Sequence, residues 1–181
     1  MSPDEARAAW GRPLPATPIV LVMGVAGSGK TTVGRLLGER LGWDFADADQ
    51  FHPAANVAKM SAGIPLTDDD RAPWLSTIAA WIDDHRAEGR PAVVTCSALK
   101  RSYRTLLTEA RPEVLPVFLD GDSVLIARRM AQRGDHFFRP GMLDGQFRVL
   151  ERPAPDEHVL VLPVVAPAAD LVALVTAAVR P

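Results

Sequence analysis

The feature that most constrains the fold of this chain is the segment 24–31, which reads Gly-Val-Ala-Gly-Ser-Gly-Lys-Thr. An apolar run at 19–23 precedes it, and helical apolar spacing begins at Thr32. A glycine-rich turn between a strand and a helix directs backbone N–H groups at one anion, and the positive end of the helix adds to the attraction. The pattern therefore predicts an α/β fold with a phosphate-binding loop. A glycine-rich turn without a ligand is the alternative interpretation.

The spacing G-x-x-x-x-G-K-[ST] assigns roles to individual residues of this loop. Lys30 is expected to reach the β- and γ-phosphates of ATP, and the Thr31 hydroxyl is placed to ligate Mg²⁺. ATP and Mg²⁺ are therefore the expected cofactors. The predicted ATP-binding residues are Gly24, Val25, Ala26, Gly27, Ser28, Gly29, Lys30 and Thr31.

Strand patterns alternate with helix patterns along the chain, which indicates a parallel sheet with helices on both faces. The resulting class is α/β, a three-layer fold with a five-stranded parallel sheet. Pro116 interrupts the fourth strand, so we expect it near an edge or a bulge. Strands are expected at 19–23, 45–49, 91–96, 114–119 and 159–165, and helices at 32–41, 56–60, 74–86, 100–109, 123–133 and 169–179.

Length and composition limit the classes of protein to consider. The 181 residues favour one domain at 18–181, preceded by a flexible extension at 1–17 that does not resemble a signal peptide. The balance of 20 basic and 22 acidic residues argues against nucleic-acid binding. No apolar run approaches the ~20 residues that cross a membrane. The single cysteine, Cys96, is typical of a reducing cytoplasm.

Two carboxylates are candidates for the chemistry. Many P-loop proteins hold Mg²⁺ through an acid at the end of a later strand, but here the strand at 91–96 continues into Ser97-Ala98-Leu99. Asp47 and Asp49 end the second strand, which we expect beside the loop. One carboxylate can organise Mg²⁺, directly or through water, while the other accepts a proton from the attacking hydroxyl. Spacing does not assign the two roles; we favour Asp47 for the metal and Asp49 as the base. A solvated acidic strand end is the alternative.

Two groups of basic residues are candidates for anion binding. Arg129 and Arg133 share a helical face and could close over the transferring phosphoryl group as catalytic residues, although a solvated basic face explains them equally well. Lys100, Arg101 and Arg104 follow the third strand, and arginine holds a carboxylate through two parallel hydrogen bonds.

Further polar candidates come from the segments after the second strand and after the basic helix. The histidines lack metal-ligand spacing, so a zinc site is not expected. The complete set of substrate-binding candidates is Asp49, His52, Arg71, Lys100, Arg101, Arg104 and His136.

Several segments resemble the bacterial gluconate kinases (gluconokinases), relatives in fold of shikimate kinase and the nucleoside monophosphate kinases. The resemblance runs from the first strand to Pro153. Its most specific segments are 63–75, Gly-Ile-Pro-Leu-Thr-Asp-Asp-Asp-Arg-Ala-Pro-Trp-Leu, and 96–101, Cys-Ser-Ala-Leu-Lys-Arg. The other matching stretches are 22–31, 47–53 with Asn56, Lys59 and Met60, 102–104, 136–138, 146–147 and 150–153.

This resemblance implies transfer of the ATP γ-phosphate to the 6-hydroxyl of D-gluconate, a homodimer, and a mobile lid at about 129–145. Ala48 stands where the family often has glycine, and Gly145 stands where a hydroxyl residue is usual. Neither departure removes a charged group. Two other functions are kept as alternatives: a P-loop kinase for shikimate or a nucleotide, and an ATP-dependent switch without a substrate of its own.

Overall fold

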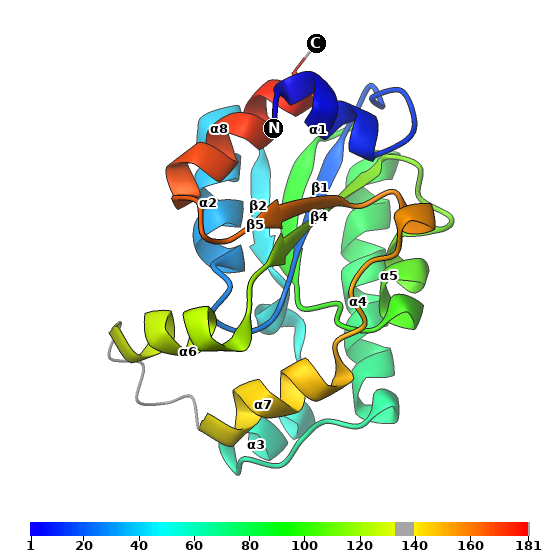
Figure 1. The fold of residues 1–181 in the computed structure, drawn as a ribbon. Helices are drawn as coiled ribbons and strands as arrows, with labels where there is room; N and C mark the ends of the chain where they lie inside the picture. The colour runs from blue at the N-terminus through cyan, green and yellow to red at the C-terminus, as the bar shows by residue number, and fades with distance from the viewer. Residues whose placement is uncertain (133–139, 181) are drawn as a thin grey trace.

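The computed structural model describes residues 1–132 and 140–180, in which a parallel sheet lies between two layers of helices (Figure 1). All neighbouring strands pair in parallel, in the order β2-β3-β1-β4-β5. The five-stranded parallel sheet is therefore confirmed. The strands are β1 (Ile19–Met23), β2 (Asp44–Asp47), β3 (Ala92–Cys96), β4 (Val114–Asp120) and β5 (Leu160–Pro163).

Helices α1, α2 and α8 cover one face of the sheet, and α4 and α5 cover the other (Figure 1). Helices α6 and α7 lie beyond the carboxyl ends of the strands (Figure 1). No helix in the described part of the chain is long and apolar enough to cross a membrane. The helices are α1 (Pro3–Ala9), α2 (Lys30–Leu41), α3 (Ala54–Ser61), α4 (Asp68–Ala87), α5 (Arg101–Thr108), α6 (Ser123–Gln132), α7 (Pro140–Val149) and α8 (Ala168–Val179), with short 3₁₀ turns η1 (Ala48–Phe51) and η2 (Pro155–Glu157).

The central position of β1 in the sheet explains why its sequence is apolar throughout. All five of its residues are buried. Val20 and Val22 face the core under α2 and α8, whereas Ile19, Leu21 and Met23 face the core under α4 and α5. Because a strand with a helical layer on each face has no solvent side, it reads as a continuous apolar run. Both layers thus hold the carboxyl end of β1, where the glycine loop begins, in a fixed position.

The N-terminal residues differ from the flexible extension predicted for 1–17. Ser2 caps α1 through a capping box with Glu5, and the indole of Trp10 is fully buried. The Trp10 indole N–H donates to the carbonyl of Pro116 at 3.0 Å. The burial of one large apolar side chain, Trp10, accounts for the order of this segment.

Pro116 lies where β4 has one strand neighbour. It pairs with Leu21 of β1, whereas pairing with β5 begins one residue later, at Val117 and Leu160. A proline has no backbone N–H to donate to a β-ladder. The carbonyl of Pro116 accepts a hydrogen bond from the Trp10 indole instead. The expectation that Pro116 sits at a local edge is therefore confirmed.

The second strand is shorter than predicted, and it does not neighbour β1. It ends at Asp47, and η1 then carries Asp49 out of the sheet. Strand β3 pairs with both β1 and β2 and separates them. The carboxylates must therefore reach the glycine loop across the end of β3, which Asp47 does, as its hydrogen bond to Thr31 shows.

Candidate active site

The glycine loop joins β1 to α2 and has the backbone conformation that its sequence predicts. Gly27 and Gly29 have φ angles of 77° and 100°, in the left-handed region that glycine adopts without strain. A Cβ at Gly27 would lie 2.6 Å from the side chain of Met130 of α6, so α6 packs closely on the loop at this glycine. The buried Ser28 hydroxyl has no hydrogen-bond partner within 1–132 and 140–180, as expected for a loop completed by a ligand.

Lys30 begins α2 and points back across the loop. Its ammonium group donates to the carbonyl of Val25 at 2.9 Å. Burial lowers the pKa of Lys30, while the nearby groups of Asp49, Cys96 and Asp47 oppose that shift. A desolvated ammonium group on an anion-binding loop interacts strongly with the phosphate that replaces its lost water.

Asp47 links the glycine loop to the turn after β2. Its Oδ2 accepts the Thr31 hydroxyl at 2.7 Å, and its Oδ1 accepts the backbone N–H of Asp49 at 3.1 Å. These oxygen donors fit Mg²⁺, which typically takes only one or two protein ligands and completes its shell with phosphate oxygens and water. The described residues contain no group of three or more acidic, His or Cys side chains that would hold a metal alone. The chemistry of the site therefore suits a metal that arrives with the nucleotide.

Asp49 has the electrostatic environment of a proton acceptor. Desolvation by the surrounding protein raises the pKa of Asp49, the charge of Asp47 raises it further, and Lys30 and His52 oppose the shift. A carboxylate with a raised pKa is a better base than an ordinary aspartate. The structure thus gives the two carboxylates different surroundings, which spacing alone did not.

His52 lies at the entrance to the segment that follows η1. Its ring stacks on Trp74 with centroids 4.3 Å apart, and burial lowers the pKa of His52. Asn56 contacts His52 at 3.4 Å and donates to the carbonyl of Asp70 at 2.8 Å. The Trp74 indole donates to the carbonyl of Ala48 at 2.7 Å, which fixes η1 against α4. The stacking on Trp74 and the contact with Asn56 therefore orient the imidazole beside the turn that carries Asp49.

The start of α4 and the start of α5 meet through a charged cluster. Lys100 donates to both oxygens of Asp68 at 2.8 Å, and the Tyr103 hydroxyl donates to the same carboxylate. Arg71 donates to the carbonyl of Leu66, and its charge reaches Asp68 and His52. Lys100, Arg71 and His52 thus lie on one side of the site, and their binding of substrate stays a prediction.

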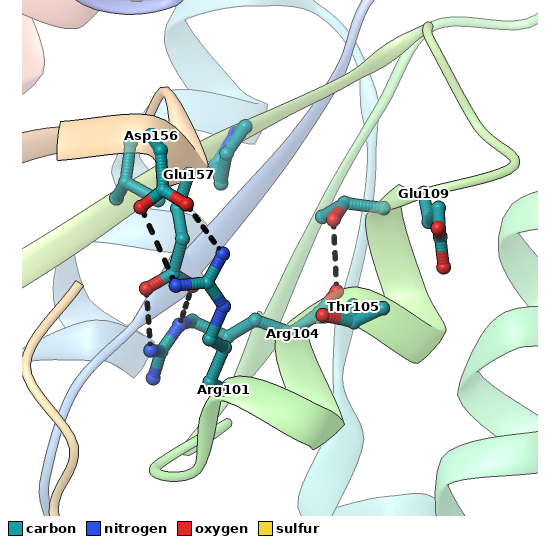
Figure 2. Close-up of a pocket in the computed structure, with 9 residues that line it drawn as sticks. Arg101, Arg104, Thr105, Glu109, Asp156 and Glu157 are labelled. Carbon is teal, nitrogen blue, oxygen red and sulfur yellow. Dashed lines mark hydrogen bonds and ion pairs between the residues drawn. The ribbon is translucent and has the colours of Figure 1, made fainter. Parts of the chain in front are cut away.

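Arg101 and Arg104, which the sequence predicts to bind substrate, form ion pairs with acidic residues of the same chain. Arg104 is buried, and its guanidinium makes two hydrogen bonds to Glu157, at 2.6 and 2.9 Å. Its remaining N–H groups donate to carbonyls, including that of Glu151 at 2.8 Å. Arg101 pairs with Asp156 at 2.6 Å (Figure 2). The structure thus gives both arginines acidic partners that lie more than fifty positions later in the chain, and substrate binding by them stays a prediction.

The pocket in Figure 2 lies around these ion pairs, between α5 and the segment that leads to β5. Its two arginines pair with Asp156 and Glu157, whereas Glu109 lies apart from these pairs (Figure 2). Neither arginine is left unpaired to hold an anionic ligand, and the candidate site remains at the glycine loop.

Of the catalytic candidates Arg129 and Arg133 and the binding candidate His136, only Arg129 lies within the described residues. Arg129 lies on α6, one residue before Met130, which covers Gly27. Arg133 and His136 lie outside the described residues. Their roles, and the lid at about 129–145, stay predictions.

Sequence reasoning missed Gln146 as a site residue. Its amide oxygen accepts the backbone N–H of Ala26, inside the glycine loop, at 2.7 Å. The available signal was its place among the apolar residues Leu143, Phe147 and Leu150, since a polar residue on the buried stripe of a helix requires a partner.

Comparisons with known proteins agree with this geometry. The family model for shikimate kinase matches residues 26–152. A gluconokinase from Gluconobacter oxydans (strain 621H) is 48% identical over 144 residues, which cover 78% of this chain and 79% of that protein. This chain belongs to the gluconokinase family. The thermosensitive gluconokinase of Escherichia coli (strain K12) is another member, 42% identical over 78% of this chain and 75% of its own length.

The fold of the gluconokinase family is also found among solved structures. The crystal structure of a gluconokinase from Sinorhizobium meliloti 1021 superposes with a TM-score of 0.80 and 42% sequence identity. The match covers 92% of this chain and 93% of that chain. Membership of the family therefore extends over nearly the whole described structure.

Proposed function

We propose that this chain is a gluconokinase, which transfers the γ-phosphate of ATP to the 6-hydroxyl of D-gluconate and gives 6-phospho-D-gluconate. The observation that carries the proposal is the 48% identity with a gluconokinase over 78% of the chain. The site agrees with it, because a nucleotide-binding loop and a carboxylate with a raised pKa lie together.

The glycine loop and α2 supply the donor side of the reaction. The backbone N–H groups and Lys30 bind the β- and γ-phosphates and stabilise the charge that spreads over the oxygens during transfer. Thr31 and Asp47 would hold Mg²⁺, directly or through water, and the metal would neutralise phosphate charge. Because Thr31 and Asp47 are already bonded to each other, this part of the site needs little reorganisation.

The turn after β2 and the starts of α4 and α5 supply the acceptor side. Asp49 accepts the proton of the attacking 6-hydroxyl, for which its raised pKa suits it. His52, Arg71 and Lys100 orient the sugar acid, and the two cations attract its carboxylate. Arg129 and Arg133 close over the phosphoryl group, and His136 contacts the substrate, as the resemblance to the family implies.

A coupled spectrophotometric assay with purified protein and Mg-ATP tests the proposal. The acceptor panel contains D-gluconate, stereoisomeric sugar acids, shikimate and AMP, and Asp49→Asn provides a matched inactive control. We expect turnover with gluconate and none with shikimate or AMP. Absence of gluconate turnover would refute the specific activity.

Shikimate is the second candidate acceptor because the matching family model is that of shikimate kinase. It becomes the preferred function if kcat/KM for shikimate exceeds that for gluconate. An ATP-dependent switch would bind ATP and phosphorylate no member of the panel.

We also propose that the protein is a cytoplasmic homodimer. The family resemblance supports the dimer, and the single, buried thiol of Cys96 suits a reducing compartment. Light scattering after size-exclusion chromatography measures the assembly, and a monomer at micromolar concentration would contradict it. Cell fractionation followed by immunoblotting tests the location.

A further inference from the structure

Helix α7 places one polar side chain on the glycine loop. Leu143 is buried, and Phe147 and Leu150 pack against the same core. Residues three and four apart on a helix share a face, so Gln146 lies on this inward stripe. The apolar anchors on either side fix the register of α7, which leaves the amide of Gln146 directed at the loop.

The polarity of the contact settles how the amide is oriented. The backbone N–H of Ala26 is a donor, so the group 2.7 Å away must be the carbonyl oxygen of Gln146 rather than its nitrogen. The amide nitrogen therefore keeps its two donors. It makes no hydrogen bond to any residue within 1–132 and 140–180.

The position of Ala26 determines what those donors face. Ala26 lies between Val25, whose carbonyl receives the Lys30 ammonium group, and Gly27, which is covered by Met130. A group bonded to a loop N–H lies beside the anion that the same loop gathers. We propose that Gln146 is an ATP ligand: its oxygen fixes Ala26, and its nitrogen donates a hydrogen bond to the terminal phosphate.

This assignment gives α7 an uncharged hydrogen-bond donor to the phosphate. The donor is neutral, so it recognises a phosphate oxygen without adding charge to a loop that already carries Lys30. It rests on the ATP-dependent activity proposed above, but not on the identity of the acceptor. The assignment predicts tighter binding of ATP than of ADP through this contact, because only ATP has the γ-phosphate.

The test is the affinity for ATP and for ADP, measured by calorimetry in Mg²⁺. Gln146→Met keeps the length of the side chain and removes both polar groups. We expect ATP binding to weaken about 10-fold more than ADP binding, as for loss of one hydrogen bond to a charged group. In Gln146→Glu the oxygen still accepts from Ala26, but the donor is replaced by a negative charge, so ATP binding should fall roughly 100-fold.

Val149→Glu is the control, because it adds the same charge to an exposed position of α7 and should bind both nucleotides normally. Equal weakening of ATP and ADP in Gln146→Met would overturn the inference and leave Gln146 as a support for the loop. Normal ATP binding in Gln146→Glu would overturn it as well.

Failure of the proposed function gives a different result. A wild-type protein that binds ATP but does not phosphorylate gluconate refutes the acceptor alone, and the ATP-to-ADP ratio of the variants still decides the role of Gln146. A wild-type protein that binds no ATP overturns both.

Discussion

Removal of the Arg104 guanidinium should destabilise the fold far more than it affects binding of the sugar acid. Arg104 and Glu157 form an ion pair whose side chains are 3% and 9% exposed. The guanidinium also donates to the carbonyl of Glu151, just after α7, so it joins α5 to the chain that leads to β5. Arg104→Met fills a similar volume but leaves a carboxylate and several carbonyls without their donors.

The expected magnitude follows from burial. Leaving one member of a buried ion pair without its partner costs about 3–5 kcal/mol. In a domain of this size, each kcal/mol lowers the melting temperature by roughly 2–4 °C, so the change should be about 10 °C. The pKa of Glu157 is lowered, as expected for a carboxylate that the ion pair stabilises. Burial alone would raise that pKa, but the hydrogen bonds from Arg104 and Ala154 lower it overall.

Urea unfolding followed by circular dichroism measures the free energy of unfolding, and the coupled assay at 20 °C below the melting temperature measures the KM for gluconate. Arg101→Met is the matched control, because its ion pair with Asp156 is 51% and 65% exposed and should contribute less than about 1 kcal/mol. The double variant Arg104→Met/Glu157→Leu should recover part of the loss, since it removes the unpaired charge.

The reasoning fails if Arg104→Met and Arg101→Met lose similar stability. It also fails if Arg104→Met raises the KM for gluconate strongly while the fold keeps its stability. That second outcome would restore Arg104 as a substrate ligand.

Four further predictions concern other parts of the structure. On the proposal that the carboxylate form of Asp49 is the base, kcat/KM should be lost as the pH falls through its raised pKa, and the pH profile of the reaction should show this acidic limb. Since folding disfavours ionisation of Asp49, Asp49→Asn should raise the melting temperature slightly at neutral pH while it lowers kcat by orders of magnitude; a lower melting temperature would contradict the pKa shift. Trp10→Ala should cost about 3–5 kcal/mol in urea unfolding, whereas Trp10→Phe, which loses the hydrogen bond to Pro116 and part of the indole volume, should cost less, about 1–3 kcal/mol. Asp47→Asn should raise the Mg²⁺ concentration for half-maximal activity about 10-fold, with Asp44→Asn, at the far end of β2, as the unaffected control.

The features that the sequence predicted well depend on neighbours in the chain. The glycine loop needs a strand before it and a helix after it, and both are present in β1 and α2. The N-terminal helix could have been found the same way, because Ser2 and Glu5 have capping-box spacing and Pro3 occupies the first helical turn.

The features that the sequence did not reveal depend on residues far apart in the chain. Nothing near Arg104 indicates that Glu157 will neutralise it, so a basic group after a strand looks like a ligand-binding group. The insertion of β3 between β1 and β2 is likewise a property of the whole sheet. Asp47 reaches the glycine loop although the sequence reasoning placed its strand beside β1, since its contact with Thr31 spans the end of β3.

The two hydrogen bonds accepted by Asp47 connect the glycine loop to the turn after β2 through one carboxylate. One oxygen holds the hydroxyl of Thr31 on the donor side, and the other holds the backbone of Asp49 on the acceptor side. On the proposed mechanism, this one carboxylate therefore links the loop that would hold the donor phosphate to the turn that would carry the base. Substitutions that shift one side must shift the other with it, so a change of acceptor specificity in this enzyme can be engineered more readily at His52, Arg71 or Lys100 than in the turn that carries Asp49.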